Sequence, residues 1–225
     1  MSNEAPSART RLKRAPERGA YDRQTIDAIL DEGLICHVAF ATDSRPAMIP
    51  TIYARVGDHV YLHGAVANRT LRALADGLEA CFCVSHVDGI VIARSAFHHS
   101  INYRSVILYG IAELVSDEAE RMLALRALVE HVVPERWPDV RAPNEQEMKR
   151  TAVLRMTLDE VSAKVRTGPP IDDEDDYALD TWAGVIPVRT AFGAPIQDPR
   201  LTSGIDPPPY VAAYARPPAS PTGVD

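Results

Sequence analysis

Short segments rich in strand-forming residues follow one another along most of the chain, and tight turns rather than long helices join them. The first three, at 34–41, 47–55 and 59–64, are separated by the turn signals TDSRP and VGD. Five later segments have the same character and lie at 79–87, 90–97, 102–115, 152–158 and 161–166. Consecutive strands joined by tight turns favour antiparallel pairing over alternating βαβ units. The sequence therefore predicts a mainly β fold, an antiparallel β-barrel with helical insertions.

Local signals refine this series of strands. The pair Asp88-Gly89 is a strong two-residue turn signal, which predicts a hairpin between 79–87 and 90–97. Gly110 predicts a bend within the long strand 102–115. Apolar residues at helical spacing and suitable terminal residues predict helices at 22–33, 68–76, 117–132 and 145–151. These helices interrupt the series of strands and do not alternate with it.

The two ends of the chain differ from its middle in charge and composition. Residues 1–24 carry a net charge of +3, whereas residues 167–225 carry −6 and contain eleven of the 18 prolines. We therefore expect a disordered or loosely docked arm over 1–20, one domain over 21–168, and an acidic, proline-rich tail over 169–225. Within the tail, residues 182–188 form a concentrated apolar patch that we expect to dock onto another surface.

Charge, hydropathy and cysteine content argue against several classes of protein. The net charge of −7 argues against a nucleic-acid partner. No apolar run approaches the ~18 residues of a membrane helix, and the N-terminal sequence is polar, so we expect a cytoplasmic protein with no membrane partner. The three cysteines lack CxxC spacing and the histidines lack metal-ligand spacing, so we expect neither disulfides nor a metal site.

Segment 61–74 combines a strand, a glycine and a short loop that leads into a helix. The chain has no P-loop and no GxGxxG, GxSxG or HExxH motif, so this segment is the main candidate for a phosphate site. Arg69 at the start of the helix would pair with a phosphate. Asn68 is also a good helix cap, and Arg69 can equally be a solvated side chain. Taken alone, the segment leaves both interpretations open.

Two further segments carry polar groups on predicted strands. In 102–106, Tyr103 and Ser105 share one face of the strand, while Arg104 lies on the other. An arginine directly before the apolar run VILYG implies a specific partner or a surface position. The other segment, 50–53, lies on the strand expected to pair with 61–64.

Together these segments resemble the flavin-binding split-barrel superfamily, which has the fold of pyridoxamine 5′-phosphate oxidase. The residues that carry the resemblance are YLHGAVANRTLRALADG, then CFCVSHVDGIVIARSAFHHSINYRSVILYGIAELV, and finally KVRTGPP followed by DTWAGVIPV. They are most similar to the pyridoxamine 5′-phosphate oxidase-related, nitroimidazole-resistance-like flavin-nucleotide-binding branch, over 20–200. The resemblance implies an antiparallel split barrel of Greek-key type, a homodimer, and FMN bound at the dimer interface.

The family's cofactor contacts correspond to individual residues of this chain. Arg69 falls in the loop that grips the phosphate, and Ser105 stands where the oxidase has a flavin-contacting Gln. The resemblance implies these cofactor-binding residues: Pro50, Thr51, Ile52, Tyr53, Leu62, His63, Gly64, Asn68, Arg69, Tyr103, Arg104, Ser105 and Trp182. Met48 and Tyr53 replace two cations of the oxidase, and its C-terminal Arg-x-His element has no counterpart here. These departures argue against genuine pyridoxamine 5′-phosphate oxidase activity.

The resemblance implies an FMN-dependent oxidoreductase acting on a small organic acceptor, such as a nitro compound, a quinone or a small carbonyl compound. In the nitroimidazole-resistance branch, a histidine of the HGA-type segment is associated with the reductive chemistry, and that position is His63. Imidazole titrates near neutral pH, so His63 would donate a proton, unless it makes a structural hydrogen bond instead. A different function is a non-catalytic flavin, deazaflavin or haem binding or sensor protein, in which His98 or His99 would ligate haem.

Overall fold

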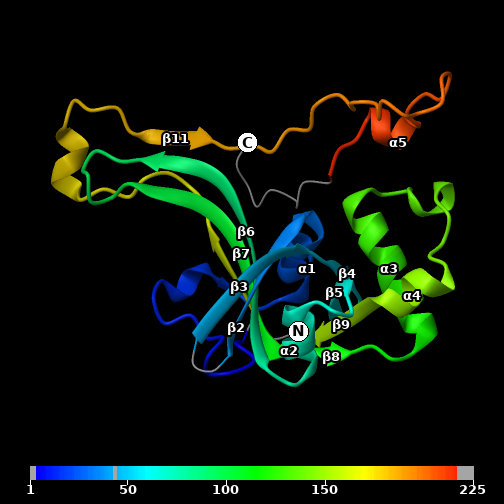
Figure 1. The fold of residues 1–225 in the computed structure, drawn as a ribbon. Coiled ribbons are helices and arrows are strands. Elements are labelled where there is room, and N and C mark those ends of the chain that lie inside the picture. Colours follow the sequence, from blue (N-terminus) through cyan, green and yellow to red (C-terminus); the bar gives the residue numbers. More distant parts are fainter. Residues whose placement is uncertain (1–3, 43–44, 217–225) are drawn as a thin grey trace.

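The computed structural model describes residues 4–42 and 45–216, and its strands form two antiparallel sheets (Figure 1). The larger sheet contains, in spatial order, β1 (Gly19–Ala20), β10 (Glu160–Arg166), β7 (Ser100–Ile111), β6 (Glu79–Ile92), β2 (Ile35–Thr42) and β3 (Arg45–Ile52), and β11 (Gly184–Pro187) pairs with β6. The smaller sheet contains β4 (Ala54–Val56), β5 (His59–Ala65), β9 (Thr151–Thr157) and β8 (Glu113–Leu114). The predicted mainly β, antiparallel fold with helical insertions is confirmed. The described strands form two hydrogen-bonded sheets and not one closed barrel.

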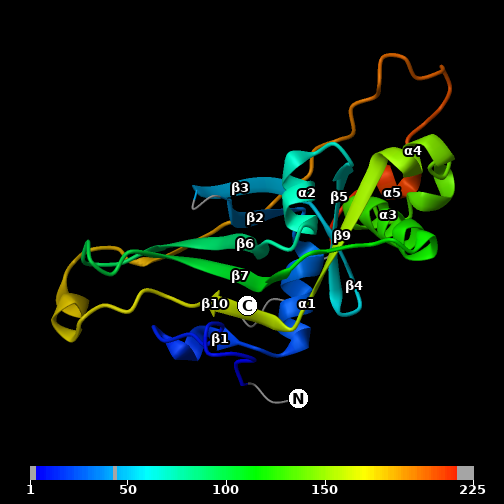
Figure 2. The same cartoon turned by 60° about the horizontal axis from the view of Figure 1, so that its bottom comes forward.

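The helices occur between strands in the sequence, and in space they lie beside the two sheets (Figure 2). They are α1 (Arg23–Glu32), α2 (Arg69–Ala75), α3 (Glu118–Val132), α4 (Glu145–Arg150) and α5 (Pro209–Ala212), with short 3-10 helices η1 (Pro16–Arg18), η2 (Trp137–Asp139) and η3 (Glu174–Ala178). Asn68 and Asp117 cap α2 and α3, because their side-chain oxygens accept hydrogen bonds from first-turn N–H groups. No helix in the described part of the chain is both long and apolar enough to cross a membrane.

The main hydrophobic core lies between the two sheets and is closed by α1. Ile26, Ile29 and Leu30 recur at helical spacing and are almost completely buried. The sheets contribute buried residues from alternating strand positions, among them Val38, Phe82, Val106, Leu108, Val60, Leu62, Leu154 and Met156. Burying each such side chain contributes roughly 1.5–3 kcal/mol, so this core holds α1 and both sheets together.

The predicted hairpin turn at Asp88-Gly89 is wrong. β6 continues through both residues to Ile92, with a β-bulge between Val87 and Gly89, and the chain reverses only at 93–99. The Asp88 carboxylate pairs with Arg104 on β7, and a Cβ on Gly89 would lie 2.8 Å from the Val185 side chain of β11. Asp88 therefore lies at a β-bulge, and Gly89 lies where β11 approaches β6 closely. The result is a long protruding hairpin, here named the β6–β7 extension (residues 87–103; Figure 1).

Two predicted long strands cross from one sheet to the other. Segment 47–55 divides at Tyr53 into β3 and β4, and segment 102–115 divides at Ala112 into β7 and β8, not at Gly110. Both crossing residues are buried, and the Tyr53 hydroxyl donates a hydrogen bond to the Leu30 carbonyl. The crossings therefore join the two sheets through the core.

The tail runs from the β6–β7 extension to the side of the molecule that carries α3 (Figure 1). After β11, residues 189–207 are exposed throughout. The chain then returns to the body, where the Arg216 guanidinium donates to the backbone carbonyls of Glu32 at 2.9 Å and Gly33 at 3.3 Å. It also donates to the carbonyl of His131. Both ends of this tail segment are anchored, and its middle presents its side chains to solvent.

Candidate functional site

β5 and α2 place His63, Asn68 and Arg69 at one end of the smaller sheet. Gly64 allows α2 to pack on β5, because a Cβ there would lie 2.7 Å from Cδ1 of Leu71. The Asn68 side chain accepts hydrogen bonds from two first-turn N–H groups of α2, which are therefore already paired. Arg69 is exposed and, within the described residues, has no hydrogen-bond or ion-pair partner. Its guanidinium is the group of this loop that is free to bind an anion.

His63 is half-buried on β5, opposite Val153 of β9. Its Nδ1 atom is shielded from solvent and has no hydrogen-bond partner in the part of the chain that the structure describes. Burial lowers the pKa of His63 below its ordinary value, so the imidazole is neutral at pH 7. A neutral imidazole with an unpaired nitrogen can hydrogen-bond a ligand or coordinate a metal. The role of His63 as proton donor stays a prediction.

β3 is an edge strand of the larger sheet and contacts β5 of the smaller sheet. Pro50 suits this position because it has no N–H to donate to a further strand. Pro50 and Ile52 are exposed, whereas Thr51 is half-buried. The structure thus brings together the two strands that carry the predicted segments 50–52 and 62–64. Tyr53, in contrast, is fully buried, so its side chain belongs to the core.

The predicted contacts on β7 divide between the two faces of the larger sheet. Tyr103 and Ser105 lie on the face away from the core, here named the outer face, whereas Arg104 points toward α1. The Arg104 guanidinium binds Glu32, with Nη1 to Oε2 at 2.5 Å, and Asp88, with Nη2 to Oδ1 at 2.7 Å. Hydrogen bonds to Asp88 and Glu32 raise the pKa of Arg104. Its charge is therefore offset inside the protein, which makes it a poor partner for a phosphate.

Trp182 lies between η3 and β11, beside the β6–β7 extension. It is 66% exposed, and its ring lies against the backbone of Gly184. In both views the extension points away from α2 (Figures 1 and 2). Within one chain, the structure therefore does not bring Trp182 together with Arg69.

The N-terminal segment covers part of the outer face, a contact that sequence reasoning missed. The Arg9 guanidinium carbon lies 4.7 Å from the centre of the Tyr109 ring, and Arg9 pairs with Glu79 at 2.7 Å and with Glu160. These acidic partners lie 70 and 151 residues away in the sequence, so no local pattern could have linked them to Arg9.

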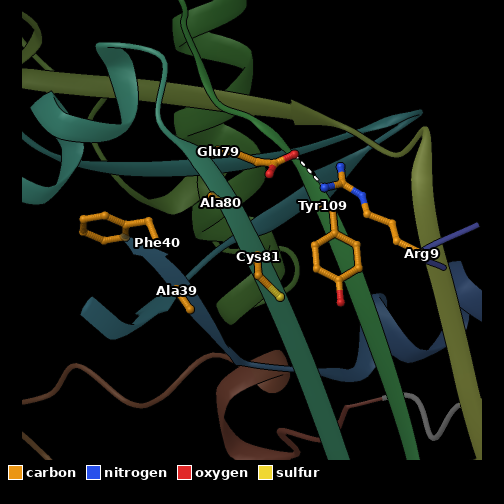
Figure 3. A pocket seen from close by; sticks show the side chains of 7 residues that line it. All are labelled: Arg9, Ala39, Phe40, Glu79, Ala80, Cys81 and Tyr109. Atoms are coloured by element: carbon orange, nitrogen blue, oxygen red, sulfur yellow. Dashed lines mark hydrogen bonds and ion pairs between the residues drawn. The ribbon is translucent and has the colours of Figure 1, made fainter. Parts of the chain in front are cut away.

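A cavity of about 330 Å³ lies beside Arg9 (Figure 3), and neither His63 nor Arg69 lines it. The residues that line it are Arg9, Ala39, Phe40, Glu79, Ala80, Cys81 and Tyr109. Burial raises the pKa of the Cys81 thiol, which therefore stays protonated at neutral pH. The cavity thus offers an aromatic and aliphatic lining with one ion pair, and no reactive thiolate.

Comparison with known families explains the resemblance noted in the sequence. The sequence model of the family described as pyridoxamine 5′-phosphate oxidase matches residues 22–165, which span α1 to β10. The chain belongs to the pyridoxamine 5′-phosphate oxidase family. The expected membership is therefore confirmed, and the two-sheet arrangement is this family's split-barrel fold. No curated protein matches the chain.

Solved structures extend the relationship beyond residue 165. The flavocytochrome Anf3 from Azotobacter vinelandii is 44% identical, with a TM-score of 0.87, and the match covers 92% of this chain and 97% of that one. A FAD and heme binding protein from Mycobacterium smegmatis is 36% identical, with a TM-score of 0.83, over 86% and 95% of the two chains. A putative 5-nitroimidazole antibiotic resistance protein from Bacteroides thetaiotaomicron shares the fold, at 20% identity and a TM-score of 0.56 over 65% and 86%.

Proposed function

We propose that this member of the pyridoxamine 5′-phosphate oxidase family binds a flavin and acts as an oxidoreductase. The observation that carries the proposal is the 36% identity, over 86% of this chain, to a protein that binds FAD and heme. The sequence predicts FMN, but because this relative binds FAD, we propose FAD as the flavin. A bound flavin would supply the electron and hydride chemistry, while the chain orients it and sets its electrostatic surroundings.

Arg69 is the residue best placed to hold the flavin phosphate. Its exposed guanidinium has no partner among the described residues, so binding a phosphate would displace no existing ion pair. The backbone of 50–52 and 62–64 would frame the ring, because β3 and β5 are in contact. The flavin would supply the electrons for reduction of a small organic acceptor, such as a nitro compound or a quinone.

A heme group is supported as a second cofactor by the 44% identity to a flavocytochrome. His63 fits an iron ligand, because its imidazole is neutral and its Nδ1 is unpaired among the described residues. His99 stays an alternative ligand, because its Nδ1 lies 2.9 Å from the carbonyl oxygen of Ser95, a contact that would leave Nε2 available to iron. As an iron ligand, His63 would not serve as the proton donor beside the flavin, so its two proposed roles exclude each other. Binding of flavin or heme without turnover is the alternative to catalysis.

The proposed oligomer is a homodimer joined through the outer face of the larger sheet. Ile90, Ile101 and Ile186 lie directly opposite one another on three paired strands, and each is 46–48% exposed. Contiguous exposed apolar side chains of this kind mark interaction surfaces. A cytoplasmic location, expected from the polar N-terminal sequence, stays a prediction.

Titration of the cofactor-free protein with FAD and with FMN, followed by flavin fluorescence, tests the cofactor proposal. Saturable binding of one FAD per chain, tighter than that of FMN, supports it. Tighter binding of FMN would restore the cofactor predicted from the sequence. Failure of both flavins to bind would overturn the proposed function.

A further inference from the structure

The turn at the tip of the β6–β7 extension, residues 93–99, packs against the segment that contains η3. Asp172 has a fully buried side chain, which accepts hydrogen bonds from the Arg94 backbone N–H at 3.0 Å and from Arg94 Nη1 at 3.1 Å. The Arg94 guanidinium also lies over the Tyr177 ring, 4.9 Å from its centre. These contacts fix the tip relative to η3.

This turn concentrates buried polar atoms that have no hydrogen-bond partner among the described residues. There are five such side-chain atoms, and three of them lie here: Nε of Arg94, Oγ of Ser95 and Nε2 of His98. Buried polar groups are nearly always paired, so these atoms point to a bound ion or a water molecule. Of the three, the His98 nitrogen can ligate a cation, whereas Nε of Arg94 is an N–H donor and cannot. His98 Nε2 lies 3.4 Å from Oδ2 of Asp173, outside hydrogen-bonding geometry.

His98 faces two carboxylates at this tip. One ligand atom from each of His98, Asp173 and Asp176 lies within 4.8 Å of the other two. All five residues at 172–176 are acidic, and among them Asp172 is the one whose carboxylate is paired with an arginine. An imidazole nitrogen with two carboxylate oxygens is a donor set suited to Zn²⁺, Mn²⁺ or Fe²⁺.

We propose that His98, Asp173 and Asp176 bind a divalent transition-metal cation at the tip of the extension. Asp173 is 82% exposed at its side chain, which gives the cation an entry path and leaves room for water ligands. The metal would tie the β6–β7 hairpin to the tail just before Trp182. The sequence gives no metal signal because His98 and Asp173 are 75 positions apart and meet only through the fold. The site uses none of the residues proposed above for flavin or heme, because His63, and not His98, is the proposed heme ligand.

Isothermal titration of the chelator-treated full-length protein with Mn²⁺, and separately with Zn²⁺, tests this site. We expect saturable binding of one ion per chain that is at least tenfold weaker in His98→Gln and in Asp176→Asn. Glu174→Gln removes one negative charge from the same short helix but no proposed ligand, and His99→Gln removes the neighbouring imidazole. Both control variants should bind within about twofold of the wild-type protein.

Absence of saturable binding in the wild-type protein would overturn the proposal. Equal weakening by Glu174→Gln and Asp176→Asn would also overturn it, because it would mean a diffuse attraction to acidic groups. If His98→Gln does not fold, pulsed electron paramagnetic resonance of Mn²⁺ bound to the wild-type protein decides the question. Coupling to an imidazole nitrogen supports the site, and its absence contradicts it.

Discussion

Arg104 on β7 and Glu32 in the last turn of α1 form a two-point ion pair across 72 residues of sequence. The distances are 2.5 Å from Nη1 to Oε2 and 3.0 Å from Nη2 to Oε1. The same guanidinium binds Asp88 at the β-bulge of β6. One arginine therefore joins α1, β6 and β7 where the β6–β7 extension leaves the core.

Arg104→Ala should lower the free energy of unfolding by about 2–4 kcal/mol, because it leaves two partly buried carboxylates facing each other without a cation. Arg155→Ala is the matched control: its guanidinium also binds two carboxylates, Glu113 and Glu120, but at a more exposed site, so we expect a clearly smaller loss of stability. Urea unfolding measures both. A loss below about 0.5 kcal/mol in Arg104→Ala, accompanied by weaker flavin binding, would place Arg104 at the cofactor instead.

Arg69→Ala should weaken flavin binding by roughly 1.5–3 kcal/mol, the contribution of a charge-assisted hydrogen bond to a phosphate. Arg72→Ala is the control on the same helix, since the Arg72 side chain donates to the Ala67 carbonyl at 3.2 Å. Fluorescence titration of the two variants measures the difference. Equal affinities in Arg69→Ala and the wild-type protein would show that the phosphate lies elsewhere.

His63→Ala should abolish heme binding and leave the fold intact. The physical reason is that His63 would offer heme iron a neutral imidazole nitrogen, whereas alanine offers no ligand atom. His59→Ala removes a histidine from the same strand and should retain heme. Absorption of the heme-reconstituted variants reports the result, and an unchanged heme spectrum in His63→Ala would reassign the ligand.

The sequence predicted the order of most strands and helices, because these depend on local patterns. Asn68 caps α2 as a local signal indicates, and the apolar face of α1 is buried as its spacing predicts. The turn at Asp88-Gly89 was predicted wrongly, because pairing of Asp88 with Arg104 and the approach of β11 to Gly89 override the local turn preference.

The candidate site was harder to predict, because its surroundings depend on contacts between distant residues. The sequence indicated that Arg104 has either a specific partner or a surface position, but it could not identify Glu32 as the partner. Nor could it place Arg9 on Tyr109, or Arg216 at the end of α1, since each contact spans at least 100 residues. Trp182 matches a family pattern, yet within one chain it lies far from Arg69.

Stability should fall as the pH drops below about 6.5, the ordinary histidine value. Burial and the nearby Arg216 lower the pKa of His131 in the folded state, so the unfolded chain binds a proton first as the pH falls. The contribution of neutral His131 to stability is therefore complete above the pKa of His131 in the unfolded chain. It is lost as the pH falls from that value toward the lower pKa of His131 in the folded protein. A histidine with a lowered pKa, such as His131, changes the free energy of unfolding by at most about 1.4 kcal/mol per pH unit.

Urea unfolding at pH 7.5 and pH 5.5 measures this dependence. His131→Gln should lower stability at pH 7.5, because it disturbs the 2.6 Å hydrogen bond from Nε2 to the Gly33 carbonyl, and should reduce the loss between the two pH values. The same pH dependence in His131→Gln and the wild-type protein would assign the effect to other groups.

Ile90→Asp should convert the proposed dimer to a monomer, because it places a charge in the row of three exposed isoleucines. Ile196→Asp is the control: this tail residue is 98% exposed, and its replacement should leave the dimer unchanged. Light scattering gives the mass in solution. A monomeric wild-type protein would contradict the proposed interface.

The most direct test of the flavin proposal is the absorption spectrum of the protein as purified, recorded before and after addition of a reductant. The account predicts the visible bands of an oxidised flavin, which bleach on reduction, together with a Soret band if His63 holds heme. Release of the flavin and its chromatographic identification as FAD would complete the result. A colourless protein that takes up neither flavin nor heme when these are added would contradict the account.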